Sequence, residues 1–205
     1  MTPRPIAFVT GNNGKFQDFQ TEIGLYGLAG ERVTLDLIEP QEASLEQIAL
    51  AKARQAHAAL QRPLIVEDSG LCIPALNDFP EALTKPVIGR LGLDGFLKVL
   101  EAVEDRRCYF RCALAYVDAH GAFGTILSEH EDGEILRAPQ GELSGRARSL
   151  LWQIFRPTGF ETAMAAMDGL TLARLFAMWR EQNTFKQFAQ LASGEPARFG
   201  VRSAA

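Results

Sequence analysis

Hydrophobic positions at the start of the chain follow first the pattern of a buried strand and then that of a helix. Residues 5–10 form a short apolar run, which is typical of a strand buried on both faces. Phe16, Phe19, Ile23 and Tyr26 then recur at the spacing of a helix face. The first residues therefore predict a strand, a loop and a helix in that order.

The same patterns continue through the first half of the chain. Further elements are expected as a strand over 33–38, a helix over 44–61, a strand over 64–66 and a helix over 93–104. Ser44 and Gln47 have the spacing of a capping box at the first turn of a helix. Strands that alternate with helices are typical of an α/β fold.

A β-hairpin is predicted in the second half. Residues 107–117 alternate between the two faces of a strand, 118–121 indicate a turn, and 122–128 return as the second strand. Helical spacing resumes over 170–191, and the tail after Gly194 is expected to fray and be flexible. The pattern as a whole predicts one α/β domain over residues 1–205, with a mixed sheet and flanking helices.

The first candidate for chemistry is the loop Thr10-Gly11-Asn12-Asn13-Gly14-Lys15, between the first strand and its helix. It lacks the glycine spacing of a Walker-type loop and of the dinucleotide pattern. A strand–loop–helix unit nevertheless directs backbone N–H groups and the positive end of the helix dipole at one spot. Lys15 in the first helical turn is unfavourable unless an anion offsets its charge. The segment is a phosphate-binding loop or a plain Asn-Gly turn, and the helical spacing after it favours the first.

The second candidate is Lys52, which lies in the middle of the apolar stripe of the helix predicted over 44–61. The stripe is formed by Leu45, Ile48, Ala49, Ala56 and Leu60. A lysine on a buried face costs free energy unless its ammonium group is paired. Two interpretations stay open: a lysine that reaches solvent at the rim of this face, and a lysine that projects into an anionic site.

Acidic residues follow two of the predicted strands. Glu67-Asp68 comes after the strand over 64–66, and Glu39 comes after the strand over 33–38. Ligands of α/β proteins bind at such strand ends. Asp68 either caps the following bend or acts as a magnesium ligand or general base, with Glu39 as a second carboxylate. Adjacent residues of a strand point to opposite sides, so only one of the pair is needed at one site. Lysines, loop amides and carboxylates together suit Mg²⁺-dependent cleavage of a polyphosphate.

Composition narrows the class of protein. A formal net charge of −4, from 21 basic and 25 acidic residues, argues against a broad cationic surface for a nucleic acid polymer. Cys72, Cys108 and Cys112 form no CxxC pair, which argues against a disulfide framework or zinc site and fits a reducing, cytoplasmic compartment. No apolar run approaches the roughly 18 residues of a membrane span, and the N-terminal apolar segment is too short for a signal peptide.

Four stretches carry a resemblance to a known family. They are Thr10 to Lys15 (T/S-G-N-x-x-K), Glu39-Pro40-Gln41 with Ser44-Leu45-Glu46 (P-E-x-Q…L-E-E), Ile48 to Arg54 (A-x-x-K-A) and Glu67 to Leu71 (E-D-S/T-G-L). The chain thereby resembles the inosine triphosphate pyrophosphatases, also called dITP/XTP nucleotide pyrophosphatases. The match is specific over residues 6–80 and looser to about residue 190.

The resemblance implies an elongated α/β fold of two lobes around a central cleft, usually dimeric, that hydrolyses a nucleoside triphosphate to the monophosphate and pyrophosphate. By position, Lys15 with the loop amides holds phosphate, and Lys52 faces the phosphates. Glu39 and Asp68 serve Mg²⁺, and Asp68 also activates the attacking water. Ser69 contacts the substrate.

The C-terminal half departs from the family pattern. The F-G-W/Y-D stretch falls on residues 149–152, so its aspartate is replaced by Trp152. The S-H-R motif falls on 184–186 and becomes Thr-Phe-Lys, and the lysine four residues before it becomes Arg180. We expect the substrate to contact four of these residues: Trp152, Arg180, Phe185 and Lys186. Because buried hydrogen-bonding groups create large specificity ratios, their loss predicts altered base specificity.

Three hypotheses follow from this pattern. The leading one is an Mg²⁺-dependent nucleotide pyrophosphatase with an altered base pocket. The second is a nucleotide-binding protein that no longer turns over, acting as a sensor or partner subunit. The third is a pyrophosphatase recruited to an unusual nucleotide. Assays of pyrophosphate release and ligand-dependent thermal stabilisation separate the first two, and substrate profiling separates the third.

Overall fold

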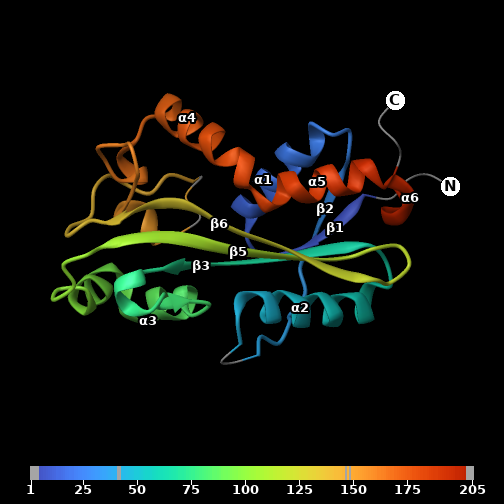
Figure 1. The fold of residues 1–205 in the computed structure, drawn as a ribbon, viewed down its shortest axis with the longest axis horizontal. Coiled ribbons are helices and arrows are strands. Elements are labelled where there is room, and N and C mark those ends of the chain that lie inside the picture. Colours follow the sequence, from blue (N-terminus) through green and yellow to red (C-terminus); the bar gives the residue numbers. More distant parts are fainter. Residues whose placement is uncertain (1–4, 41–42, 146, 148, 202–205) are drawn as a thin grey trace. The chain divides into compact units, whose positions relative to one another are not determined.

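The structure is a computed structural model that describes residues 5–40, 43–145, 147 and 149–201. In chain order the main elements are β1 (Ile6–Val9), α1 (Asn13–Gly24), β2 (Gly30–Val33), α2 (Leu45–Leu60), β3 (Leu64–Cys72), β4 (Pro80–Glu81), α3 (Thr84–Val99), β5 (Arg107–Val117), β6 (Phe123–Ile135), β7 (Phe155–Pro157), α4 (Gly169–Trp179), α5 (Thr184–Gly194) and α6 (Pro196–Phe199). The strands form a mixed sheet in the order β2-β1-β3-β5-β6-β7, and β4 pairs with β3 (Figure 1). The α/β prediction is confirmed.

Contacts divide the chain into two compact units. The first contains residues 1–68, 112–128 and 182–205, and the second contains 69–111 and 129–181. The chain passes from one unit to the other within β3, β5 and β6. Each unit has its own hydrophobic core.

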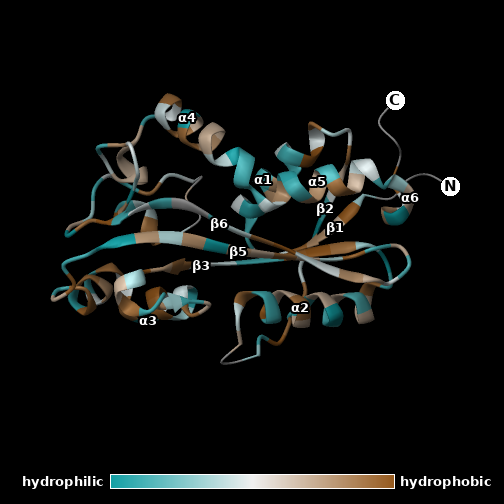
Figure 2. Cartoon of the chain, viewed as in Figure 1, coloured by the Kyte–Doolittle hydropathy of each residue, from teal (hydrophilic) through white to brown (hydrophobic). Residues whose placement is uncertain are grey.

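The first unit is built on parallel pairing of β1 with β2 and with β3. Helices α1 and α5 lie on one face of these strands and α2 lies on the other (Figure 1). The ring of Phe8 on β1 packs edge-on against Phe19 of α1 and Phe185 of α5, with ring centroids 5.1 and 5.4 Å away. In Figure 2, β1 is coloured hydrophobic, as expected for a strand covered on both faces.

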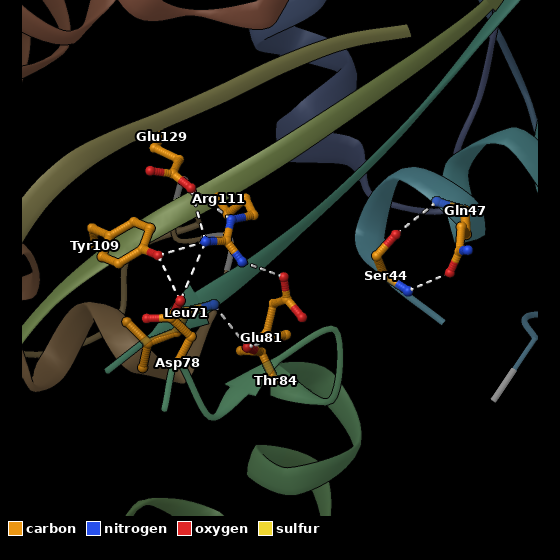
Figure 3. Close-up of polar contacts among 9 residues, drawn as sticks. All are labelled: Ser44, Gln47, Leu71, Asp78, Glu81, Thr84, Tyr109, Arg111 and Glu129. Atoms are coloured by element: carbon orange, nitrogen blue, oxygen red, sulfur yellow. Dashed lines mark hydrogen bonds and ion pairs between the residues drawn. The ribbon is translucent and has the colours of Figure 1, made fainter. Parts of the chain in front are cut away.

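Helix α2 begins as the sequence predicts. The Ser44 side chain accepts a hydrogen bond from the backbone N–H of Gln47, and the Gln47 side chain accepts one from the backbone N–H of Ser44 (Figure 3). This reciprocal capping box satisfies two N–H groups that the helix itself leaves open. It fixes where α2 starts and therefore how far along the helix Lys52 lies.

The second unit packs α3, α4 and several irregular segments around its own core. Trp152 lies in a short 3₁₀ helix (Leu150–Gln153), and its ring is 6.1 Å from that of Phe176 on α4. Helix α3 is kinked at Gly92, where φ is 63°. Because Gly92 is not helical, α3 consists of two helical segments, and the second begins after Gly92, as expected for the helix over 93–104, but ends earlier, at Val99. The first segment, which begins at Thr84, was not predicted.

Several element boundaries differ from the sequence prediction. The strand expected over 33–38 is instead β2, Gly30–Val33, because these residues pair with β1 in register. Gly30 is suited to this place, since a Cβ there would lie 2.6 Å from the Phe19 ring. Strand β3 continues past residue 66 to Cys72, because Leu71 and Cys72 pair with β4. Glu67 and Asp68 thus lie within a strand and not after it.

The C-terminal region also differs. The helix expected over 170–191 is interrupted, because Asn183 caps a new helix through a 2.7 Å hydrogen bond from the N–H of Phe185. Part of the tail expected to fray forms α6, whose Phe199 is 2% exposed and packs against Tyr116 and Phe188. Residues 202–205 of that tail lie outside the described residues. Among the described residues, no helix is both long and apolar enough to cross a bilayer. The three cysteines are free thiols.

Candidate active site

The loop after β1 is organised around the N-terminus of α1. The Thr10 hydroxyl accepts a hydrogen bond from the N–H of Asn12 at 3.1 Å, and the Asn12 carbonyl oxygen Oδ1 accepts one from the N–H of Lys15 at 3.0 Å. Asn12 is therefore the N-cap. The N–H groups of Asn13 and Gly14 belong to the first turn, where a helix supplies no acceptor of its own. The segment has the local geometry of an anion-binding helix start.

The side chain of Lys15 forms an ion pair with the buried Glu67. Its Nζ lies 2.7 Å from Glu67 Oε2, and only 5% of the Glu67 side chain is exposed. Burial by itself would lower the pKa of Lys15, but the carboxylates of Glu67 and Asp68 outweigh it and raise that pKa above its usual value. Lys15 is therefore held protonated at the start of α1, and Glu67 is the anion that its position requires.

Lys52 lies between two carboxylates. Its Nζ is 2.9 Å from Glu39 Oε1 and 2.8 Å from Asp68 Oδ1. Burial would lower the pKa of Lys52, and the attraction of Asp68 and Glu39 raises it instead. The interpretation of Lys52 as a lysine in an anionic site is thus supported by its contacts, with the ammonium group only partly open to solvent.

The carboxylate of Asp68 uses one of its two oxygens. Oδ1 accepts the hydrogen bond from Lys52, whereas Oδ2 is buried and has no hydrogen-bond partner among the described residues. Burial raises the pKa of Asp68, and this effect exceeds the opposing attraction of Lys52 and Lys15. A carboxylate that is more basic than usual and has a free oxygen suits a general base or a metal ligand.

The two ion-pair groups lie on opposite faces of β3. Glu67 contacts Lys15 of α1, and Asp68 contacts Lys52 of α2, and these two helices cover opposite faces of the first unit's strands. Adjacent residues of a strand alternate in direction, which accounts for the arrangement. Sequence reasoning assigned only Asp68 to the site and missed Glu67. The signal was present, because Lys15 in the first helical turn required an anion.

The residues present fit a magnesium ion. No group of three or more His, Cys, Asp or Glu side chains in the described part of the chain is arranged to hold a metal by itself. Glu39 and Asp68 supply two carboxylates, and Asp68 Oδ2 is an orphaned acceptor. Mg²⁺ is commonly held by one or two carboxylates together with substrate phosphates and water. Glu39 and Asp68 would hold it here, with the remaining ligands supplied by those partners.

The residues predicted to contact the base half of the substrate are placed differently. Phe185 is 4% exposed and packs against Phe8 and Phe19, so its ring is part of the first unit's core. Lys186 is half-buried on α5 of the same unit. Trp152, 8% exposed, lies in the core of the second unit, which also contains Ser69 and Arg180. Their contacts with a substrate stay predictions.

A further charged cluster surrounds Arg111 on β5, within the second unit. Its guanidinium group donates to Glu81 at 2.6 Å, to Glu129 at 2.8 Å and to the hydroxyl of Tyr109 at 2.7 Å (Figure 3). Asp78 accepts from the same hydroxyl at 3.0 Å. Glu81 has a φ of 44°, in the region that favours glycine. Its backbone carbonyl also accepts a hydrogen bond from the Thr84 hydroxyl at 2.6 Å.

A model of the Ham1 family matches residues 6–170 of the chain, which include every residue of the two ion-pair groups. The chain belongs to the Ham1 family. This confirms the relationship that the motifs around Lys15, Glu39 and Asp68 indicated.

Known relatives agree with this assignment. The Ham1 chain described above is 41% identical over 137 residues to a dITP/XTP pyrophosphatase of Methanopyrus kandleri, covering 67% of this chain and 72% of that protein. It is 32% identical over 196 residues to a dITP/XTP pyrophosphatase of Ignicoccus hospitalis, covering 95% and 100%. A solved nucleoside-triphosphatase / dITP/XTP pyrophosphatase of Mycobacterium abscessus superposes with a TM-score of 0.69 at 25% identity, covering 87% and 95%.

Proposed function

We propose that this Ham1 protein hydrolyses a nucleoside triphosphate to the nucleoside monophosphate and pyrophosphate, with Mg²⁺ and with altered base specificity. The observation that carries the proposal is Lys52, whose ammonium group is held between Glu39 and Asp68 in a chain of this family. Relatives at 32–41% identity are named dITP/XTP pyrophosphatases, which supports the class of reaction.

The residues divide the work as follows. Asp68, with its raised pKa and unpartnered Oδ2, accepts a proton from the attacking water. Lys15 and Lys52 neutralise charge that develops on the phosphate oxygens, and the N–H groups at the start of α1 add fixed dipoles. A bound Mg²⁺ would polarise the phosphoryl group and screen its charge. Glu67 holds Lys15 in place and keeps it protonated.

Two sequence changes, at positions predicted to contact the base, support altered base specificity. Trp152 stands where the family has an aspartate and Phe185 where it has a histidine, and both side chains are buried among apolar neighbours. Apolar side chains cannot reject a wrong base through unpaired hydrogen-bonding groups. The family resemblance implies a homodimer, which light scattering of the purified protein tests, and the pattern of cysteines favours a cytoplasmic location.

The test is a panel of nucleoside triphosphates, including dITP and XTP, incubated with Mg²⁺ and assayed for pyrophosphate. We expect release from at least one nucleotide, and a loss of roughly 10²–10⁴-fold in kcat for Asp68→Asn, because the variant lacks the general base. Binding without release from any nucleotide would instead support a nucleotide-binding protein that does not turn over.

A further inference from the structure

The ammonium group of Lys52 stands where a cation shared by Glu39 and Asp68 would stand. We propose that Lys52 is a placeholder for Mg²⁺: it occupies this position without substrate and leaves it only when a polyphosphate offers another anion. Magnesium binding is thereby coupled to polyphosphate binding. The inference rests on the proposed function and concerns the regulation of that same site.

Geometry supports the placeholder role. One Nζ atom lies within 2.9 Å of both carboxylates, so the two acceptors converge on a single point. The exposed fraction of the side chain is 14% for Lys52 and 19% for Asp68, whereas it is 57% for Glu39. The Lys52–Asp68 contact is therefore shielded from water, and Glu39 is the member of the group that is open to solvent.

Charge repulsion prevents the Lys52 ammonium group and a metal ion from lying between Glu39 and Asp68 at the same time. Two carboxylates and one ammonium group leave a net charge of −1, and a second cation a few ångströms from the ammonium group is repelled strongly in a partly buried site. A triphosphate brings several negative charges, which give Lys52 a new partner and free the carboxylates. Mg²⁺ and polyphosphate therefore each improve the binding of the other by the same factor.

The ligand count points the same way. Two carboxylates are fewer than an isolated protein site needs for Mg²⁺, which prefers six oxygen ligands in near-octahedral geometry. No larger cluster of potential ligands is arranged for a metal among the residues that the structure describes. Phosphate oxygens would complete the set, so the free protein is expected to bind the metal weakly.

The test is calorimetry on the wild-type protein, first with Mg²⁺ alone and then with inorganic pyrophosphate in the presence and absence of Mg²⁺. We expect no saturable binding of Mg²⁺ alone below millimolar concentrations, and at least about tenfold tighter binding of pyrophosphate when Mg²⁺ is present. Equal affinity for Mg²⁺ with and without pyrophosphate would overturn the placeholder role, and this arm needs no variant.

The variant Lys52→Met removes the placeholder and keeps the length of the side chain. Its affinity for Mg²⁺ alone is expected to rise by at least about tenfold, because the repelling charge is gone. Arg54→Met is the matched control, because it also removes a cation from α2. The guanidinium group of Arg54 lies over the Phe123 ring. Equal gains in the two variants would overturn the proposal. Circular dichroism confirms that Lys52→Met is folded.

The two proposals fail in different ways. Tight binding of Mg²⁺ alone by an active enzyme would overturn the placeholder role and leave the pyrophosphatase function intact. Coupled binding of Mg²⁺ and pyrophosphate by a protein that releases no pyrophosphate from any nucleotide would overturn the function and leave the placeholder role intact.

Discussion

At Lys15 the protein holds a partly buried cation in the first turn of a helix, and Glu67 is the side chain that compensates its charge. A buried charge that loses its partner is destabilised far more than an exposed one. The pair therefore has two roles in the proposed site. It keeps Lys15 charged, and it holds Nζ beside Glu67 on β3.

The first prediction concerns Glu67→Gln. Removing the carboxylate leaves Lys15 with a weaker partner, so kcat/KM for pyrophosphate release should fall about 10–100-fold, the value of one charge-assisted hydrogen bond. Glu46→Gln is the control, because it removes a carboxylate of the same unit that accepts a hydrogen bond from the Thr125 hydroxyl at 2.7 Å. Equal losses in the two variants would show that Glu67 has no special role.

Individual residues of the site were predictable to different degrees. Lys52 was identified from its place on an apolar helix face, because such a lysine needs a partner, and the structure supplies Glu39 and Asp68. Glu67 was missed, because adjacent residues of a strand point to opposite sides and only Asp68 was assigned to the site. Sequence spacing gives the direction of a side chain, but it does not say which helix covers each face.

Among the elements, the short pairing of β3 with β4 depends on Gly70. A Cβ at this position would lie 2.1 Å from the carbonyl oxygen of Glu81, so any larger residue must push β4 away. Gly70→Ala is therefore expected to destabilise the protein by about 2–3 kcal/mol through overpacking. Urea unfolding measures this loss. Gly89→Ala is the control, because its Cβ would meet nothing within 4 Å, and a loss as large there would contradict the steric argument.

The C-terminal helix α6 is tied to the β5–β6 turn through Asp118, which is 3% exposed. Arg198 donates to Asp118 at 2.8 Å, and the backbone N–H groups of His120 and Ala122 donate to it at 2.9 Å. Burial would raise the pKa of Asp118, but these hydrogen bonds outweigh it and lower the pKa below the ordinary 3.8. The ionised carboxylate is thus a stabilising group.

The sign of the pH dependence follows from that lowered pKa. The stabilisation is fully present above pH 3.8 and is lost as the pH falls through the lower pKa of the folded state. Asp118→Asn should cost about 2 kcal/mol at pH 7, and the difference from wild type should shrink in the acid range below pH 3.8. Urea unfolding at neutral and acid pH measures both values. A difference that stays constant with pH would contradict this assignment.

Helix and strand boundaries were predicted well where local sequence signals set them. They were predicted less well where pairing with a distant strand sets them. The capping box at Ser44 fixed the start of α2 from sequence alone. The strand assigned to 33–38 was displaced, because the register with β1 selects Gly30–Val33. The tail was expected to fray, because the sequence around Phe199 does not indicate that its ring packs against Tyr116 and Phe188.

At the scale of the whole molecule, the alternation of strands and helices was sufficient to predict an α/β fold with a mixed sheet. The division into two compact units was implied by the family resemblance and not by the pattern of apolar positions. Chain crossings within β3, β5 and β6 carry no local sequence signal, because the strands continue through them.

Base discrimination is a property of the whole substrate site. The family's aspartate and histidine at positions 152 and 185, which would form hydrogen bonds with the base, are absent. The values of kcat/KM for dITP, XTP, dATP and dGTP should therefore differ by less than about 100-fold, the range that apolar pockets achieve. Steady-state assays on the four nucleotides give these ratios. A preference of about 10⁴-fold for one of them would show that other hydrogen-bonding groups read the base.

The proposed reaction cleaves a nucleotide between its α and β phosphates, with Asp68 as the general base. Phosphorus NMR of a dITP reaction with Mg²⁺ identifies the products directly, with Asp68→Asn beside the wild type. We expect deoxyinosine monophosphate and pyrophosphate from the wild type and roughly 10²–10⁴-fold slower formation by the variant. A diphosphate with inorganic phosphate, or equal rates for the two proteins, would contradict it.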